Sequence, residues 1–175
     1  HVGTNAVPHL LKWISHETPQ WRTDLGDYLS GSPWPLSAQP IVDLVMDRRS
    51  EALAFKAAYC FRDLGTNAHI AFPQLQAIAT TPNNGRSSGF AIMALEASGS
   101  SAIPNLLAVV GGPNSPYQRT AINSVFGLIS TNRDQKSRWS PITERLNDPD
   151  PIIRKGVTNF SKLIRPELLT NGIPR

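Results

Sequence analysis

The stretch Ala102-Ile103-Pro104-Asn105-Leu106-Leu107-Ala108-Val109-Val110 is the clearest copy of a pattern that recurs along the chain. A small or polar residue stands two positions before a proline, and apolar residues follow at helical spacing. The arrangement recurs around Pro8, Pro40 and Pro73, and more weakly around Pro141, so the proline-to-proline intervals are 32, 33, 31 and 37 residues. Proline is tolerated in the first turn of a helix, where its missing N–H would have had no partner. The spacing therefore predicts a tandem repeat in which each proline begins a helix.

A four-residue motif marks the ends of the repeating units. Gly3-Thr4-Asn5-Ala6 recurs letter for letter as Gly65-Thr66-Asn67-Ala68, and loosely as Gly99-Ser100-Ser101-Ala102. Glycine after a helix supplies the left-handed conformation that ends it. The distance from glycine to proline is five residues in the first and third copies and eight in the second. This difference predicts a three-residue loop insertion at residues 69–71.

Apolar residues between these markers recur with the period of an α-helix. Two stripes have this spacing: Leu53, Ala57, Cys60 or Phe61 and Leu64, and Ile153, Val157, Phe160 and Ile164. Residues 89–97 and 121–129 are apolar around most of the helix circumference, which predicts helices packed between neighbours. Because alternation of period two is absent over any useful length, we predict an all-α fold of short and long helices in pairs.

The stretch Asn147-Asp148-Pro149-Asp150-Pro151-Ile152-Ile153-Arg154-Lys155-Gly156-Val157 resembles the turn and second helix of the HEAT repeat family. The family includes a short bacterial form, the phycobilisome-lyase-like HEAT repeat. Arg86, Arg119 and Arg154 lie 33 and 35 residues apart, as the recurring arginine of the family does. The resemblance implies a right-handed α-solenoid with first helices on the convex side and second helices lining a concave groove. Neighbouring repeats in such a fold bury one another's apolar stripes.

We predict a single solenoid domain over residues 1–175, with approximate repeats at 1–36, 37–70, 71–100, 101–138 and 139–175. Residues 16–36 are expected to be irregular, because Pro19, Pro33 and Pro35 interrupt the second helix of the first repeat. Because the sequence opens on the tail of a repeat, we expect either a preceding helix or an atypical cap at its start.

Structural roles are the first expectation for several conspicuous side chains. Trp13 is expected in the core, and Trp21 and Trp34 are expected to pin the irregular segment onto the solenoid. Cys60 lies on an apolar stripe and is expected to be a buried thiol. The recurring arginines are expected to bond a turn aspartate or a neighbouring carbonyl; the alternative is a basic ladder for an extended anionic ligand.

No sequence motif predicts catalysis. The P-loop, dinucleotide-binding, zinc-protease and nucleophile-elbow patterns are absent. We therefore assign no catalytic, cofactor-binding or metal-ligating residue, and we predict that the chain is not an enzyme. His16-Glu17 resembles one of the repeated iron-binding pairs of deoxyhypusine hydroxylases, a HEAT-like enzyme class. A single pair supplies too few ligands, so an exposed loop pair is expected.

Positive charge is concentrated in the last third of the chain. The whole sequence has a net charge of +4. Residues 1–110 contain seven Lys/Arg and eight Asp/Glu, whereas residues 111–175 contain ten and five. Six residues there are candidate binding residues: Arg133, Lys136, Arg138, Trp139, Lys155 and Lys162. On a helix, Lys155 and Lys162 point within about 20° of each other, opposite the apolar stripe. The alternative is a charged face that only contacts solvent.

The predicted function is a non-enzymatic interaction scaffold that binds a protein or peptide through the groove of the solenoid. A preformed rigid surface loses little entropy on binding. A second hypothesis is nucleic-acid binding through the basic third, as in HEAT-like DNA glycosylases. A third is a bilin-lyase-like accessory role, which depends on the repeat subtype alone. The sequence does not identify the partner.

Composition excludes several classes of protein but assigns no compartment. Hydrophobic residues make up 40% of the chain and charged residues 17%, which argues against disorder. No stretch approaches the roughly 20 apolar residues of a membrane helix. One cysteine excludes an internal disulfide, and it suits the cytosol as well as an exported protein. A signal or anchor preceding His1 is equally compatible with the sequence.

Overall fold

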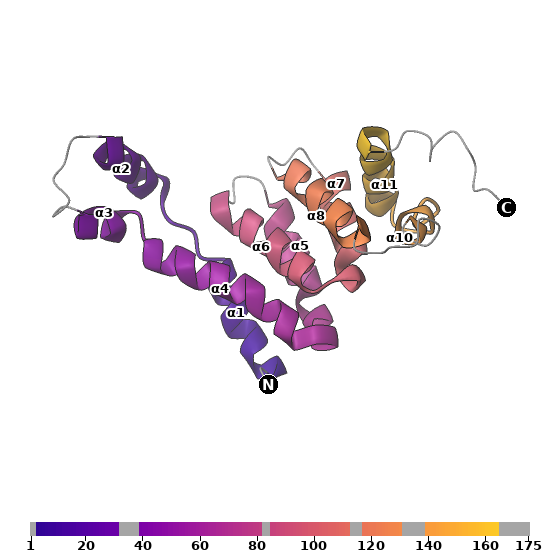
Figure 1. Ribbon diagram of the computed structural model, residues 1–175, viewed down its shortest axis with the longest axis horizontal. Coiled ribbons are helices and arrows are strands. Elements are labelled where there is room, and N and C mark those ends of the chain that lie inside the picture. Colours follow the sequence, from indigo (N-terminus) through magenta and orange to yellow (C-terminus); the bar gives the residue numbers. More distant parts are fainter. Residues whose placement is uncertain (1–2, 32–38, 82–84, 113–116, 131–138, 165–175) are drawn as a thin grey trace.

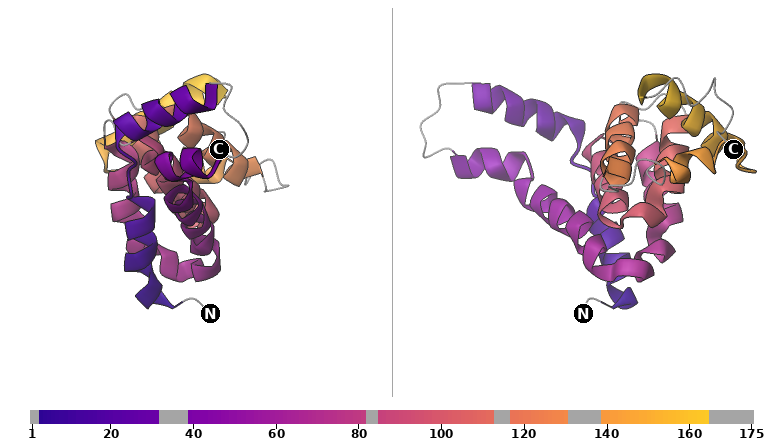
Figure 2. Two further views of the ribbon diagram at one scale, coloured as in Figure 1. Left: turned by 90° about the vertical axis from the view of Figure 1, so that its left-hand side faces the viewer. Right: turned by 45° about the vertical axis from the view of Figure 1, so that its right-hand side comes forward.

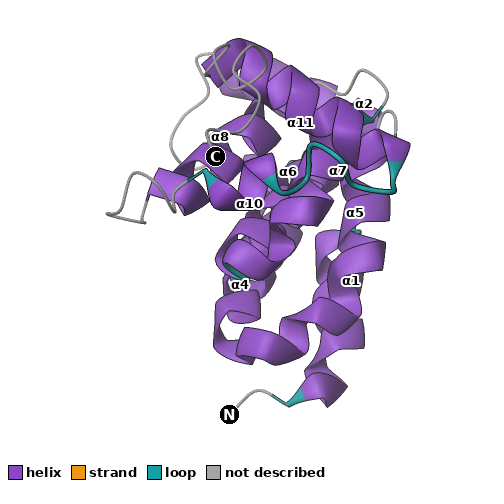
Figure 3. Cartoon of the chain, turned by 90° about the vertical axis from the view of Figure 1, so that its right-hand side faces the viewer, coloured by secondary structure: helices purple, strands orange, loops and turns teal. Residues whose placement is uncertain are grey.

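The computed structural model describes residues 3–31, 39–81, 85–112, 117–130 and 139–164, and these residues form helices and no strands (Figures 1 and 3). The all-α prediction is therefore confirmed for this part of the chain. The α-helices, in chain order, are α1 (Val7–Ile14), α2 (Gln20–Gly31), α3 (Gln39–Val45), α4 (Arg48–Leu64), α5 (Phe72–Thr80), α6 (Gly85–Ala97), α7 (Ile103–Gly111), α8 (Gln118–Ser130), α10 (Ser140–Thr143) and α11 (Pro151–Ile164).

The recurring prolines begin helices as predicted. Each occupies the second position of its helix, and the helices are α1, α3, α5, α7 and α10. The four-residue motifs form 3₁₀ turns before three of them: η1 (Thr4–Ala6), η3 (Gly65–Ala71) and η4 (Ser100–Ala102). Gly65 and Gly99 have φ values of 55° and 83°, which only glycine adopts readily. The three-residue insertion at 69–71 extends η3 rather than forming an open loop.

Three helix pairs form the body of the molecule: α1 with α4, α5 with α6, and α7 with α8. Successive pairs contact each other through α4, α6 and α8, and also through α5 and α7 (Figure 1). The core between them is continuous and contains fully buried side chains from four helices: Phe61, Leu75, Ile92, Leu95, Leu106 and Val109. The apolar helix α6 lies between α4 and α8, as its composition predicted.

Helices α2 and α3 form an arm that extends away from this body (Figures 1 and 2). The prediction that residues 16–36 are irregular is wrong for residues 20–31, which form α2. Pro19 does not interrupt this helix because it precedes it, and its carbonyl accepts hydrogen bonds from the N–H groups of Arg22 and Thr23. Residues 32–36 lie outside the described part of the chain.

Two of the tryptophan predictions are also wrong. Trp13 is 41% exposed on α1, because the helix buries the opposite face through Leu10, Leu11 and Ile14. Trp21 is 64% exposed on α2 and therefore does not pin the arm onto the body. Trp34 lies outside the described residues. Cys60 is only partly buried, although it packs against the core as its stripe suggested.

The last helix crosses α7 at a contact between two glycines. Helix α11 packs mainly against α7 (Figure 3). A Cβ atom added at Gly156 would lie 1.8 Å from the Leu107 carbonyl oxygen, and one at Gly111 would lie 1.9 Å from the Ile152 carbonyl oxygen. The two backbones approach closely because neither position carries a side chain.

The turn before α11 is organised around the buried side chain of Asp148. Arg145 donates a hydrogen bond to Asp148 Oδ2 at 2.8 Å, and the backbone N–H of Asp150 donates to Oδ1 at 3.0 Å. These hydrogen bonds, that of Arg145 first, lower the pKa of Asp148 below its ordinary value of 3.8. Arg154 donates to the carbonyls of Asp148 and Pro149. The structural role expected of the recurring arginines is thus confirmed for Arg154.

We expect Asp148 to make the stability of the fold depend on acid pH. Because its pKa is lower in the folded chain than in the unfolded chain, its stabilisation is present above the unfolded value and lost as pH falls below it. The Asp148→Asn substitution should therefore reduce stability at neutral pH, and the difference from wild type should shrink toward about pH 3. Urea unfolding of both proteins at several pH values measures this difference. A difference that stays constant with pH would contradict the assignment.

Candidate functional site

The structure places three of the six candidate binding residues from the sequence. Trp139 is half-buried, and its ring centroid lies 6.4 Å from that of Phe160 on α11, so the indole packs against the core. Lys155 and Lys162 are exposed on α11. Arg133, Lys136 and Arg138 lie outside the described residues. Of the three residues that the structure describes, Trp139 packs inward whereas Lys155 and Lys162 face solvent.

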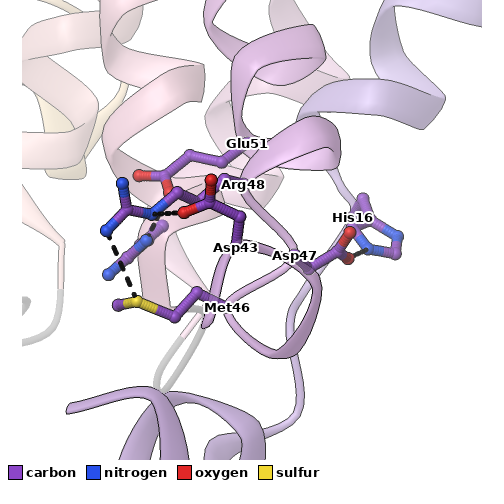
Figure 4. Close-up of polar contacts among 7 residues, drawn as sticks. His16, Asp43, Met46, Asp47, Arg48 and Glu51 are labelled. Carbon is purple, nitrogen blue, oxygen red and sulfur yellow. Dashed lines mark hydrogen bonds and ion pairs between the residues drawn. The ribbon is translucent and has the colours of Figure 1, made fainter. Parts of the chain in front are cut away.

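A different cluster of polar side chains lies where the arm joins the body (Figure 4). Asp47 directly precedes α4 and lies in the left-handed region, with φ 52° and ψ 38°. His16, which follows α1, contacts it through Nε2 and Oδ2 at 2.8 Å. Burial raises the pKa of Asp47, but the hydrogen bonds from His16 and Ser50 together with the nearby charges of His16 and Arg22 lower it by more, so the net shift is downward. Arg22 of α2 donates to the Leu44 carbonyl at 2.8 Å and links the two helices of the arm.

The first residue of α4 is held by two neighbours at this joint. Arg48 Nε lies 3.2 Å from Asp43 Oδ1, and its Nη2 lies 3.8 Å from the sulfur of Met46 (Figure 4). One turn further along α4, Glu51 Oε2 pairs at 2.5 Å with Nη1 of Arg86 on α6. Exposed ion pairs of this kind contribute only about 0–1 kcal/mol. Their main effect is to fix the orientation of the Arg48 and Arg86 side chains at the surface.

Glu17, which is distant in the sequence, caps the N-terminus of α6. The backbone N–H of Ser87 donates to Glu17 Oε1 at 3.2 Å. A carboxylate at this end is favoured by the helix dipole and by the unpaired N–H groups of the first turn. The expected exposed pair His16-Glu17 is indeed exposed, but both side chains are engaged. A pocket of about 370 Å³ lies beside Glu17 and also contacts Glu51 and Tyr117.

A second pocket, of about 530 Å³, is a groove between α4 and the first turns of α6. Its apolar lining consists of Met46, Ala52, Phe55 and Phe90. Its charged lining consists of Arg48, Glu51, Lys56 and Arg86. The two pockets adjoin, because both are lined by the Arg86–Glu51 ion pair and by Phe90. We call the second pocket the α4–α6 groove.

The groove lies on a face of α4 that is separate from its core face. Positions 48, 51, 52, 55 and 56 lie on one side of a helix with 3.6 residues per turn. The buried residues of α4 lie on the other side: Ala54, Ala57, Ala58, Phe61 and Leu64. Phe55 is consequently 44% exposed, with its ring centroid 4.9 Å from that of Tyr59. Helix α4 therefore presents an aromatic and cationic face to its surroundings.

The aromatic face of α4 could have been identified from the sequence, although the apolar stripe on the same helix is the more conspicuous pattern. Phe55 and Tyr59 are four residues apart but lie off the stripe formed by Leu53, Ala57 and Leu64. Two aromatic residues at that spacing, next to Lys56 and off the apolar stripe, indicate an exposed aromatic patch. The partner of Arg86, by contrast, lies 35 residues away on α4 and could not be identified from spacing.

Comparisons with known proteins do not identify a relative. None of the protein families, curated proteins or solved structures compared with this chain matches it. Within the described ranges, no group of three or more His, Cys, Asp or Glu side chains is arranged to hold a metal ion. In the same residues, no helix has the length and apolar character needed to cross a membrane.

Proposed function

We propose that the chain is a HEAT-type right-handed α-solenoid that acts as a non-enzymatic interaction scaffold and binds a protein or peptide in a groove lined by its second helices. The sequence support is the repeated proline spacing and the HEAT-like turn at residues 147–157. The structural support is the packing of α1/α4, α5/α6 and α7/α8 as successive pairs. In this arrangement α4, α6 and α8 are the second helices.

The observation that carries the proposal is the α4–α6 groove, which lies along two of these second helices. It combines half-exposed aromatic rings with charged groups that are held by ion pairs. Aromatic and arginine side chains are the residues that most often anchor protein interfaces. Because they stand on packed helices, little backbone entropy is lost when a partner binds.

Exposed apolar side chains on the arm support the same function. Trp21, Leu25 and Tyr28 lie along one face of α2, and their exposed fractions are 64%, 40% and 72%. Leu44 of α3 is also exposed. Contiguous exposed apolar surface of this kind is typical of interaction sites.

Selection from a displayed random-peptide library tests the scaffold function. With the immobilised chain as bait, we expect enrichment of a recurrent peptide motif. Synthetic peptides with this motif should bind the chain in solution with dissociation constants in roughly the micromolar range, as measured by fluorescence anisotropy. If successive rounds enrich no peptide over a bait-free control, the proposed function fails.

Nucleic-acid binding is the second candidate, because Lys155 and Lys162 are both exposed on α11. It requires binding to generic DNA at about 50 mM salt, with affinity that falls steeply as salt is raised. It also requires that the Lys155→Glu, Lys162→Glu double variant bind more weakly than wild type. Absence of binding at low salt would eliminate this candidate.

A further inference from the structure

We infer that the α4–α6 groove binds an acidic peptide segment that inserts one large apolar side chain between Phe55 and Phe90. The inference rests on the proposed function and specifies the partner. The volume of the groove, about 530 Å³, lies within the usual range of ligand pockets. Its lining separates into an apolar part and a cationic part, and each part selects one feature of the peptide.

The apolar part provides a place for a bulky side chain. Phe55 of α4 is 44% exposed, and Phe90 of α6 is partly buried and packed against the core. Met46 and Ala52 complete this part of the lining. An inserted leucine or aromatic side chain would cover the rings of Phe55 and Phe90 and remove apolar surface from water, which favours binding. The flexible thioether of Met46 can adapt to different side chains.

The charged part favours carboxylates. Three cations and one carboxylate line the groove, so its net charge is +2, or +1 when Asp43, the ion-pair partner of Arg48, is counted. Arg86 is paired with Glu51. Among the described residues no acidic side chain forms an ion pair with Lys56, so its ammonium is available to a carboxylate of the partner. Paired arginines retain further N–H donors that point away from their partners.

The pattern of charge favours a short acidic peptide over a uniform polyanion. Glu51 lies inside the groove, and Glu17 lines the adjoining pocket. A nucleic-acid backbone carries a phosphate at every residue and would bring charge against both carboxylates. A peptide can place one or two carboxylates at Lys56 and Arg48 and an apolar side chain between them. Main-chain flexibility then lets the segment avoid the acidic pocket.

The composition of library-selected peptides is the first measurement. We expect them to contain an excess of Asp and Glu together with at least one Leu, Ile, Phe or Trp. Their binding should weaken about tenfold between about 50 mM and 500 mM salt, because exposed charges are screened over that range.

Two groove variants are the second measurement. Phe55→Ala and Lys56→Glu should each weaken binding of a selected synthetic peptide about tenfold. Both side chains are exposed, so the variants should keep the circular dichroism spectrum and thermal midpoint of the wild type. Replacing the critical glutamate of the peptide by lysine should restore binding to Lys56→Glu, as expected of a direct charge pair.

Matched substitutions elsewhere provide the controls. Phe126→Ala removes an aromatic side chain of similar exposure, 42%, from α8, and Lys12→Glu makes the same charge change on α1. Neither should change affinity by more than about twofold. Selected peptides that are basic or uncharged, or that bind both groove variants normally, would overturn this inference and leave the scaffold function intact. Failure to select any peptide would overturn both.

Discussion

Replacing Gly156 by alanine is expected to destabilise the fold by about 2–3 kcal/mol, although alanine is the better helix former by about 1 kcal/mol. The new Cβ would lie 1.8 Å from the Leu107 carbonyl oxygen, and this contact is with backbone rather than with a flexible side chain. Helices α7 and α11 would have to separate, which opens the packing around Val157 and Phe160. For a chain of this length the thermal midpoint should fall by roughly 5–10 °C.

Two further glycine substitutions test whether the loss of stability comes from the contact between α7 and α11. Gly111→Ala should have a similar cost, and the double variant should cost less than the sum, because both substitutions separate the same two helices. Gly127→Ala on α8 is the opposite case. The nearest atom to its Cβ would be Glu96 Oε1 at an ordinary 3.7 Å. Gly127→Ala should therefore stabilise the chain by about 0.5–1 kcal/mol. A Gly156→Ala variant as stable as Gly127→Ala would show that α11 does not pack on α7 in this way.

The proline spacing predicted the local structure of this chain well, for a physical reason. A proline in the first turn and a glycine after the last turn act through the backbone of their own segment, so Pro104 and Gly99 can be interpreted without knowing the fold. Pro19 shows the limit of this reasoning. The same residue can end one helix or precede another, and residues 20–31 show that it precedes one.

The candidate site was less predictable, because it depends on contacts between distant segments. Arg86 meets Glu51 and Glu17 meets Ser87 only after α1, α4 and α6 have packed together. The basic residues chosen from the sequence were selected by local charge and, for Lys155 and Lys162, by their position on a helix face, and neither property indicates where a concave surface forms. The exposed aromatic rings of α4 are a better signal, since Phe55 and Tyr59 contact each other and form an apolar patch rather than a single exposed ring.

Truncating Phe61 to alanine is expected to have the largest effect of any single substitution considered, about 3–5 kcal/mol. Phe61 is fully buried on α4, in the continuous core shared by α1 and α6. Removing its ring leaves a cavity that rigid helices on both sides cannot close. Because folded domains are stable by only about 5–15 kcal/mol, this loss is a large fraction of the total stability. Urea titration followed by circular dichroism measures the loss.

Phe55 lies about one and a half turns before Phe61 on α4. If the two faces of α4 have the functions assigned to them, truncating Phe55 should weaken peptide binding rather than stability. Its ring is 44% exposed and lines the groove. Phe55→Ala should therefore cost less than about 1 kcal/mol of stability while weakening peptide binding about tenfold. Phe61→Ala, assayed below its unfolding transition, should bind peptide normally wherever it remains folded. If Phe55→Ala is as destabilising as Phe61→Ala, the α4–α6 groove is part of the core and not a surface for a partner.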